Sequence, residues 1–274
     1  MSLDKNPFIN RPQHKHGAVP FDDIKLEHFI PALDYAIAEA EKTLESIKSN
    51  PESPTFDNTA LQMESGTELM DAVANTYFNL MSAESDNKFK ELAQDISPKL
   101  SAFKNKVLLD SKLFSRVKAL YESRDKDALT SEQKRLIEEK YTEFTLNGAL
   151  LNDTDKEKVR KIDEELSKLS PKFSQNTLNA TNDFTYHTED ETELSGLPDM
   201  AKEQAAETAQ KKKKDSGWMF TLQMPSYIPV MQYADNRQLR ETLYKARSKV
   251  SFGGKYDNQE IIKKTTTLRY EKAR

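Results

Sequence analysis

The sequence predicts a mainly α protein that contains one small antiparallel β ribbon. Long stretches place apolar residues three or four positions apart, which is the spacing of one buried helix face. Only two short stretches, residues 184–187 and 218–222, alternate in the way that a half-buried strand does. Charged residues make up 31% of the 274 residues and Gly only 7 of them. This composition fits long solvated helices better than a sandwich or a Gly-rich nucleotide-binding sheet.

We expect three regions along the chain. Residues 1–25 form an extended N-terminal arm, residues 26–182 a helical domain, and residues 183–274 a β ribbon followed by further helices. The arm is rich in Pro and lacks helical periodicity, so it needs apolar anchors. Its expected anchors are Phe8, Ile9 and Phe21.

The first helix of the domain has its apolar residues on a single stripe, at Ile30, Leu33, Ile37, Ala40, Leu44 and Ile47. Pro31 is tolerated in its first turn, where the missing N–H would have no partner. A second helix follows the capping residues of 56–59, with inward residues expected at Leu69, Val73, Thr76 and Leu80. A third helix begins near Asp86, and Pro98 predicts a kink in it near Ser97.

The next helices are expected to begin at local capping signals. Thr130 and Thr154 each stand three residues before a Gln or Glu, which is the spacing of a capping box. Pro171 predicts a bend in the helix that follows Thr154. The residues expected to be buried by these helices and the one before them are Leu113, Val117, Leu120, Leu136, Tyr141, Phe144, Val159, Ile162, Leu166, Leu169 and Phe173.

The last region contains the predicted ribbon, in which residues 184–187 pair with residues 218–222. Trp218, Phe220 and Leu222 are expected on its buried face because they alternate with less apolar neighbours. Pro225 ends the second strand, since it lacks a backbone donor. Asp235 and Asn236 are candidate caps for a helix that buries Leu239 and Leu243.

Several motifs of this chain resemble the zinc oligopeptidases of the thimet oligopeptidase and peptidyl-dipeptidase family. The most specific match runs from Gly217 to Tyr244 and continues through residues 253–258 into the helix of residues 260–273. Shorter landmarks occur earlier in the same order: Asn6-Pro7-Phe8, Phe21-Asp22-Asp23-Ile24, His28-Phe29-Ile30-Pro31-Ala32, Phe56-Asp57-Asn58-Thr59 and Leu194-Ser195-Gly196-Leu197-Pro198. The resemblance covers nearly the entire chain, and its early landmarks look closer to the bacterial peptidyl-dipeptidases.

The resemblance implies an N-terminal helical part that forms one wall of a substrate channel in a zinc-dependent peptidase of short peptides. The family's His-Glu-x-x-His signature is absent from this chain, so the resemblance implies that the catalytic half follows beyond Arg274. Zinc is then the cofactor of the full-length enzyme, and we expect none in this fragment. No residue here is expected to be catalytic or to bind a metal. The fragment alone is expected to be inactive.

Three aromatic residues are candidates for lining the substrate channel: Trp218, Tyr227 and Tyr233. Amphipathic aromatics suit a surface that contacts peptides. Core packing of the strand and of the helices behind it is the favoured alternative for all three residues.

Composition also excludes several classes of protein. The net charge of −4 arises from basic and acidic residues interspersed along the helices, so no nucleic acid partner is expected. No apolar run is long enough to span a membrane, and we expect a soluble protein of the cytoplasm or the bacterial periplasm. A metal site made by His14, His16 and His28 is rejected because no Cys or fixed carboxylate joins them. The run Lys211–Lys214 is expected to be a solvated loop tip.

The rival hypothesis is a free-standing helical protein-interaction module without catalysis. A completed last helix would favour this module, whereas residues 256–274 look like a helix that is cut before its end. A fragment of a channel enzyme should leave apolar side chains uncovered, so we expect it to self-associate or to fray after about residue 256. Its expected partners are its own missing catalytic half and short peptide substrates.

Overall fold

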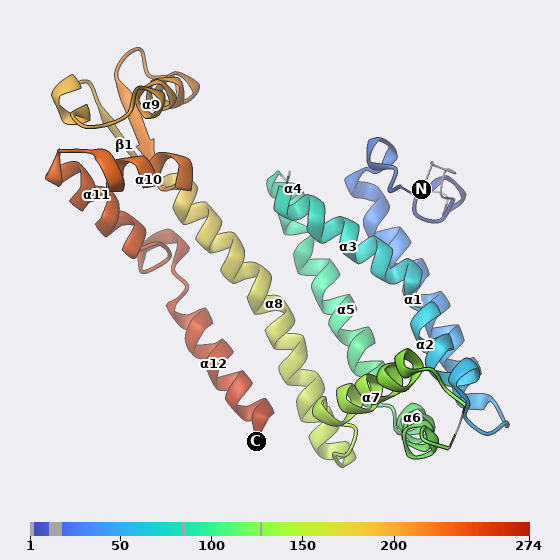
Figure 1. Ribbon diagram of the computed structural model, residues 1–274. Helices are drawn as coiled ribbons and strands as arrows, with labels where there is room; N and C mark the ends of the chain where they lie inside the picture. Colours follow the sequence, from blue (N-terminus) through green and yellow to red (C-terminus); the bar gives the residue numbers. More distant parts are fainter. Residues whose placement is uncertain (1–2, 11–17, 84–85, 127) are drawn as a thin grey trace. The chain divides into compact units, whose positions relative to one another are not determined.

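The computed structural model describes residues 3–10, 18–83, 86–126 and 128–274, except for the side chain of Asn87. It divides into two compact units, an N-terminal unit of residues 1–168 and a C-terminal unit of residues 169–274 (Figure 1). The boundary between them falls inside one long helix. The boundaries expected from the sequence, after residues 25 and 182, remain predictions.

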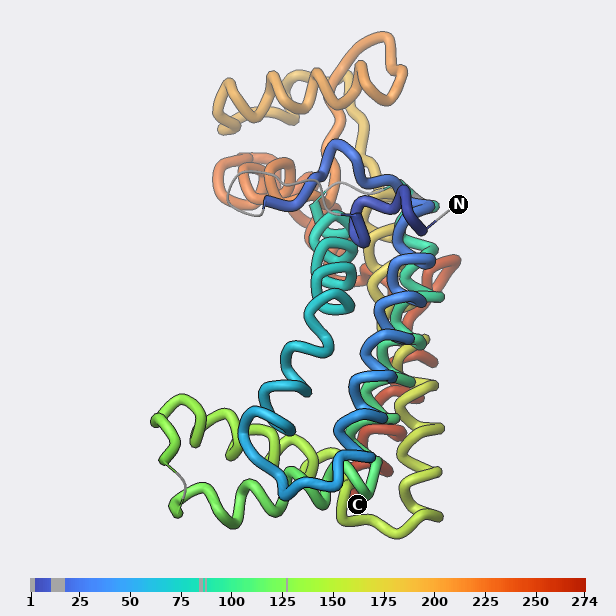
Figure 2. The backbone as a smooth tube through the Cα atoms, turned by 90° about the vertical axis from the view of Figure 1, so that its right-hand side faces the viewer, coloured from blue at the N-terminus to red at the C-terminus, as the bar shows by residue number. Residues whose placement is uncertain are grey.

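The N-terminal unit is built from helices. Its elements are the short 3-10 helices Leu3–Lys5 and Phe21–Asp23, α1 (Leu26–Ser49), a π-helical segment (Phe56–Leu61), α2 (Gln62–Ser65), α3 (Glu68–Ala83), α4 (Asn87–Glu91), α5 (Ala93–Leu108), α6 (Ser111–Ser123), α7 (Ser131–Leu146) and the start of α8 (Asp153–Asp183). Helices α3, α5 and α6 pack against α1, and α7 packs against α6. Figure 2 shows the α6–α7 pair crossing the lower end of α1.

The N-terminal arm is fixed to the start of α1 by polar contacts. The side chain of the buried Asn6 donates to the carbonyl oxygen of His28 at 2.8 Å and accepts from the backbone of Phe8 at 3.0 Å. His28 in turn uses Nδ1 to accept from the backbone N–H of Lys25 at 2.9 Å, which satisfies a free donor at the helix start. Phe8 is buried as expected, whereas Phe21 is exposed and anchors nothing.

Aromatic rings fill the core between α1, α3 and α4. The ring of Phe29 meets those of Phe8, Tyr77 and Phe89 at centroid distances of 5.2–5.5 Å. The hydroxyl of Tyr77 donates to the carbonyl oxygen of Phe89 at 2.6 Å, so this buried phenol is paired. Burial raises the pKa of Tyr77 well above its usual range, because the phenolate would lose its hydration.

Most of the predicted helix starts are confirmed, with three shifts. Thr130 forms the predicted capping box with Gln133, and Asp86 caps α4. The second helix is capped by Thr55, which forms a capping box with Asn58 of the predicted segment 56–59, and α8 begins behind Asn152 instead of Thr154. The third predicted helix is interrupted at Leu92, and α5 continues through Pro98.

Predicted burial is correct for α6, whereas on α1 Ile30 and Ile37 are only half-buried and on α7 Ile137 is buried instead of Leu136.

Helices α3 and α8 also differ from the prediction. On α3 the predicted Val73 and Thr76 are buried, but Met70 and Tyr77 are buried in place of Leu69 and Leu80, which are half-buried. On α8 only Val159 of the predicted residues is fully buried, and Phe173 is exposed. The helix α8 passes through Pro171 without interruption.

The C-terminal unit contains the end of α8, a two-stranded sheet and four further α-helices. Its elements are β1 (Thr185–Thr188), the 3-10 helix Glu191–Leu194, α9 (Asp199–Lys211), β2 (Trp218–Thr221), α10 (Met224–Tyr233), α11 (Arg237–Ser248), the 3-10 helix Gly254–Tyr256 and α12 (Gln259–Ala273). The strands are antiparallel, with Thr185 opposite Thr221 and Thr188 opposite Trp218. The predicted ribbon is therefore confirmed, with each strand shifted by no more than one residue.

The second strand is covered on both faces, which the alternating pattern did not predict. Phe220 is buried as expected, but its neighbour Met219 is buried as well. Successive residues of a strand point to opposite faces, so both faces are covered. Helices α9 and α10 both contact β2, which accounts for this burial.

A polar clamp holds the beginning of α12 against α8. The side chain of the buried Asn258 donates to the carbonyl oxygen of Phe173 at 3.0 Å and accepts from Asn176 at 2.9 Å. The carboxylate of Asp257 accepts from the backbone N–H of Gln259 at 3.0 Å. Since α12 has no fully buried residue and only a half-buried stripe at Ile261, Thr265 and Leu268, these contacts contribute to fixing the start of the helix.

Acid is expected to loosen this clamp. Backbone hydrogen bonds from Gln259 and Gly253 lower the pKa of Asp257 below its ordinary value. A carboxylate with a lowered pKa stabilises the fold above its unfolded pKa of about 4, and this contribution is lost as the pH falls through the lowered value. Amide exchange at Gly253 and Gln259 should accelerate over that acidic window. Asp257→Asn should remove the pH dependence, and a normal or raised pKa for Asp257 would contradict the assignment.

Candidate functional site

The three aromatic candidates occupy different environments in the C-terminal unit. Trp218 on β2 and Tyr227 on α10 are half-buried and pack against the core formed by Leu194, Leu197, Ala205, Phe220, Val230, Ala234, Leu239 and Leu243. The guanidinium of Arg247 lies 4.9 Å from the ring centroid of Tyr227 and donates to the carbonyl oxygen of Leu222. Tyr233 is 53% exposed at the end of α10. Tyr233 is therefore the candidate most accessible to a ligand.

The position of Tyr233 is set by the loop that contains Ser195 and Gly196. The backbone N–H of Asp235 donates to the carbonyl oxygen of Ser195 at 2.8 Å, and the Ser195 hydroxyl donates to the Asp235 carboxylate at 2.8 Å. Gly196 has a φ of +82° and lies directly against the Tyr233 carbonyl. The Leu194–Pro198 motif thus fixes the end of α10.

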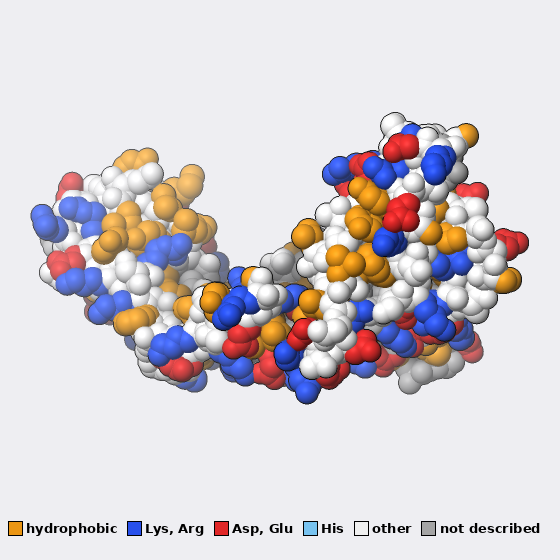
Figure 3. All heavy atoms as spheres, turned by 90° about the horizontal axis from the view of Figure 1, so that it is seen from below, with side chains coloured by type: hydrophobic (Ala, Val, Ile, Leu, Met, Phe, Trp, Pro, Cys, Tyr) orange, Lys and Arg blue, Asp and Glu red, His pale blue; other side chains and the backbone are white. Residues whose placement is uncertain are grey.

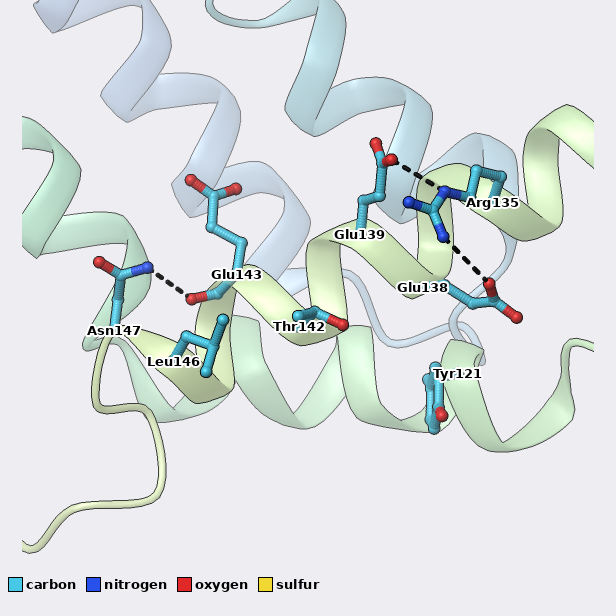
Figure 4. A pocket seen from close by; sticks show the side chains of 8 residues that line it. All are labelled: Tyr121, Arg135, Glu138, Glu139, Thr142, Glu143, Leu146 and Asn147. Atoms are coloured by element: carbon cyan, nitrogen blue, oxygen red, sulfur yellow. Dashed lines mark hydrogen bonds and ion pairs between the residues drawn. The ribbon is translucent and has the colours of Figure 1, made fainter.

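A wide groove lies on the N-terminal unit beside α6 and α7. It has a volume of about 660 Å³, and its lining residues are Tyr121, Arg135, Glu138, Glu139, Thr142, Glu143, Leu146 and Asn147 (Figure 4). Arg135 pairs with Glu139 at 2.9 Å and with Glu138 at 4.0 Å. Ion pairs within one exposed helix are common on protein surfaces, so these contacts do not by themselves indicate a catalytic site.

The described residues do not fit a zinc ion. Over residues 3–10, 18–83, 86–126 and 128–274, no three His, Cys, Asp or Glu side chains gather in a group that could hold a metal. His28 is buried and uses Nδ1 for the helix start, and the Nε2 atom of His187 is 2.8 Å from the carbonyl oxygen of Ser216. His14 and His16 lie outside the described residues.

Hydrophobic side chains gather on the surface of the C-terminal unit, which occupies the left of Figure 3. The exposed large apolar residues of its helices and loops include Met224, Ile228, Tyr244, Phe252, Ile262 and Tyr270. They lie on α10, α11, α12 and the linker between the last two helices. None of the helices in the described part of the chain has the length and hydropathy that a membrane-spanning helix needs.

Residues 28–156, within the N-terminal unit, match the family described as Neurolysin/Thimet oligopeptidase, N-terminal domain. This match agrees with the family that the sequence motifs resemble. The chain contains the N-terminal domain of the neurolysin and thimet oligopeptidase family.

The relatives extend this similarity over the whole chain. It is 32% identical to the chloroplastic and mitochondrial organellar oligopeptidase A of Arabidopsis thaliana, over 100% of this chain and 35% of the relative. Oligopeptidase A of Haemophilus influenzae is 32% identical over 98% of this chain and 39% of the relative. Dipeptidyl carboxypeptidase of Escherichia coli is 29% identical over 98% of this chain and 40% of the relative. The chain thus spans less than half of the length of these relatives.

The sequence reasoning missed one property of the C-terminal unit. The sequence analysis predicts basic residues interspersed along the helices, but the excess of basic over acidic residues is concentrated in the last part of the chain. Eleven basic and four acidic residues lie between Arg237 and Arg274, a net charge of +7. Counting charges by segment instead of over the entire chain would have found this asymmetry.

Proposed function

We propose that this chain is the N-terminal, non-catalytic part of a zinc-dependent oligopeptidase of the peptidyl-dipeptidase type. The whole enzyme would cleave short peptides, and this chain would form one wall of its substrate channel. The main support for this proposal comes from relatives named oligopeptidase A and dipeptidyl carboxypeptidase. They align with this chain over 98–100% of its length. The chain covers only the smaller part of each relative, which supports a zinc site and catalytic residues located beyond Arg274.

Within the channel wall, we assign Tyr233 as a peptide-contacting residue, ahead of the half-buried Trp218 and Tyr227. Tyr233 combines an exposed ring with a backbone that is fixed by the Ser195–Asp235 contacts. A residue whose backbone is already fixed loses less freedom when it packs on a ligand.

The coding sequence beyond Arg274 gives the first test, and a His-Glu-x-x-His motif is expected there. The longer protein should cleave short peptides, lose activity on chelation and regain it with zinc, while the 274-residue chain should be inactive. A longer protein without this motif or without peptidase activity would favour the free-standing interaction module instead.

The channel assignment needs its own variants in the longer, active protein. Tyr233→Ala should raise KM about two- to tenfold with little change in kcat, because an aromatic contact contributes about 0.5–1.5 kcal/mol. Tyr244→Ala is the matched control, since Tyr244 is similarly exposed at 58% on α11. Equal effects of the two substitutions, or no effect of Tyr233→Ala, would remove Tyr233 from the channel wall.

A further inference from the structure

The turn between α7 and α8 contains the only Asn-Gly pair of the chain, Asn147-Gly148. Asn147 is the C-cap of α7. The backbone N–H of Gly148 donates to the carbonyl oxygen of Thr145 at 3.4 Å, and that of Ala149 donates to the carbonyl oxygen of Phe144 at 3.0 Å. These are the two hydrogen bonds of a Schellman motif, and Gly148 has the positive φ, +99°, that this motif requires after the cap.

The side chain of Asn147 contributes to the same helix end. Its Nδ2 atom donates to the carbonyl oxygen of Glu143 at 2.8 Å, a contact that Figure 4 marks with a dashed line. The carbonyl groups of the last turn carry the negative end of the helix dipole, so a donor is favourable there and a carboxylate is unfavourable. An aspartate at position 147 would therefore lose this hydrogen bond and add a negative charge to the helix end.

An Asn that precedes Gly is prone to deamidation, because Gly has no side chain that hinders attack by its backbone nitrogen. In this reaction the Gly148 nitrogen bonds to Cγ of Asn147, the Cγ–Nδ2 bond breaks, and ammonia leaves with the proton of the Gly148 amide. Water then opens the resulting succinimide ring. Breaking the bond to Cγ gives aspartate, whereas breaking the bond to the backbone carbonyl carbon gives isoaspartate, in which the main chain runs through Cβ.

The folded turn holds this pair in a conformation in which the ring does not close. Ring closure requires Cβ of Asn147 and the nitrogen of Gly148 to lie on the same side of the Cα–C bond. The ψ of Asn147 is 11°, so the Gly148 nitrogen eclipses the backbone nitrogen of Asn147, and Cβ is rotated away by about 120°. A rotation of this size carries the following residues away from the last turn of α7. The Schellman hydrogen bonds therefore have to break before Asn147 reacts.

We propose that Asn147 is a deamidation site that the folded turn protects and that reacts when the end of α7 opens. Both products then weaken the closed turn. Aspartate lacks the donor to Glu143. Isoaspartate lengthens the main chain by one carbon atom before Gly148, so the hydrogen bonds to Thr145 and Phe144 lose their register. Deamidation thus converts a transient opening of the turn into a lasting loss of stability.

The turn also belongs to the core of the N-terminal unit. Ala149 is 7% exposed and Phe144 is fully buried, and both are members of its main hydrophobic cluster. Opening of the turn exposes Ala149 and uncovers part of this cluster. All groups that the proposal uses lie within residues 143–149, so it does not depend on peptidase activity.

Peptide mapping by mass spectrometry on the 274-residue chain tests the proposal. The chain is incubated at mildly alkaline pH, where the Gly148 amide loses its proton more readily, in buffer and in a denaturing concentration of urea. Deamidation raises the mass of the peptide by about 1 Da. Fragment ions distinguish Asn147 from Asn152, which lies in the same tryptic peptide, and chromatography separates isoaspartate from aspartate. The rate at Asn147 should be at least tenfold higher in urea, because the folded turn is open for only a small fraction of the time.

A pair of matched variants tests whether opening of this turn controls the reaction. Ala149→Gly removes the buried methyl group of the turn and keeps the backbone N–H that bonds to Phe144. It should accelerate deamidation of Asn147 in buffer at least threefold. The control Ala209→Gly removes a similarly buried methyl group from α9 in the C-terminal unit and should change the rate less than twofold.

Two substitutions of Asn147 itself test the product and the chemistry. Asn147→Asp reproduces the aspartate product, so hydrogen exchange at the backbone amide of Ala149 should accelerate at least threefold. Asn147→Gln keeps a carboxamide but needs a larger ring for the same attack, so position 147 should stay unmodified under the same conditions.

Four outcomes would overturn the proposal. Absence of a mass change at Asn147 in urea would mean that it is no deamidation site. Equal rates in urea and buffer would mean that the folded turn gives no protection. Equal rates for Ala149→Gly and Ala209→Gly would place the controlling step outside this turn. Unchanged exchange at Ala149 in the Asn147→Asp variant would show that the product does not weaken the end of α7. Circular dichroism should confirm that all variants keep their helical structure.

Discussion

Replacing Gly196 with alanine is expected to destabilise the C-terminal unit by about 3 kcal/mol or more. An added Cβ at this position would lie 2.2 Å from the carbonyl oxygen of Tyr233 and 3.0 Å from the backbone nitrogen of Asp235. Both neighbours are backbone atoms of the α10–α11 connection and cannot rotate away. The positive φ adds a further ~1–2 kcal/mol of strain for a residue with a side chain.

The expected loss of stability exceeds the effect of one strained residue, because the loop that contains Gly196 also makes the hydrogen bonds between Ser195 and Asp235. Moving Gly196 away from Tyr233 would stretch both hydrogen bonds between Ser195 and Asp235. Large effects of single substitutions arise from such combinations of strain and lost contacts. Urea unfolding monitored by Trp218 fluorescence reports on this unit, since Trp218 is the only Trp of the chain.

Gly254→Ala is the matched control for this experiment. Gly254 also has a positive φ, of +73°, but no atom lies within 4 Å of its added Cβ. This variant should lose only the ~1–2 kcal/mol of backbone strain. Equal destabilisation by both substitutions would show that the close contact between Gly196 and the Tyr233 carbonyl adds nothing to the cost of the positive φ angle.

Local signals in the sequence predicted the elements whose causes are themselves local. The capping box at Thr130 and the cap at Asn236 involve residues two or three positions apart, so they can be read from spacing. The β ribbon was also predicted, because alternating apolar residues are easily distinguished in a chain whose other segments repeat every 3.6 residues. The core of α6 at Leu113, Val117 and Leu120 follows from one regular stripe.

Features that depend on distant parts of the chain were not predicted. The inner face of α3 includes Met70 and Tyr77 because they meet α1 and α4, and the apolar pattern of α3 fits more than one face. Lys156 is buried, and its ammonium donates to Ser111 at 2.8 Å, a contact between residues 45 positions apart. Sequence reasoning places a Lys on a solvated face unless a partner is known.

The candidate site shows the same division between local and distant causes. Aromatic residues are frequent between residues 218 and 233, but their pattern in the sequence does not distinguish core packing from exposure. Trp218 and Tyr227 are half-buried because α10 and the ribbon share one core. Tyr233 is exposed because α10 ends there and Ala234 takes the buried position.

The second large effect is expected at Arg116, which joins α6 to the segment between α1 and α2. Its guanidinium donates to the carbonyl oxygens of Asn50 at 3.0 Å and Glu52 at 3.2 Å. It also donates to the hydroxyl of Thr59 at 3.2 Å and to the side-chain oxygen of Asn58 at 3.0 Å. All four acceptors are neutral, so Arg116 acts as a hydrogen-bonding clamp and not as half of an ion pair.

Arg116→Met should destabilise the N-terminal unit by about 2–4 kcal/mol, because hydrogen bonds to a charged group contribute about 1.5–3 kcal/mol each and are not additive. Arg116→Lys should cost less, since an ammonium keeps the charge but cannot reproduce the planar fork. Hydrogen exchange should show the loss over residues 50–61, where the four acceptors lie. Chemical unfolding followed by circular dichroism measures the change in the free energy of unfolding.

Arg135→Met is the control that separates this clamp from an ordinary surface arginine. Arg135 is exposed on α7 and pairs with Glu138 and Glu139 within its own helix. Exposed ion pairs of this kind contribute about 0–1 kcal/mol, so the substitution should leave exchange over residues 50–61 unchanged. If Arg116→Met were as mild as Arg135→Met, the segment between α1 and α2 would be held by its apolar contacts and its own capping box, and the four hydrogen bonds of Arg116 would add little to stability.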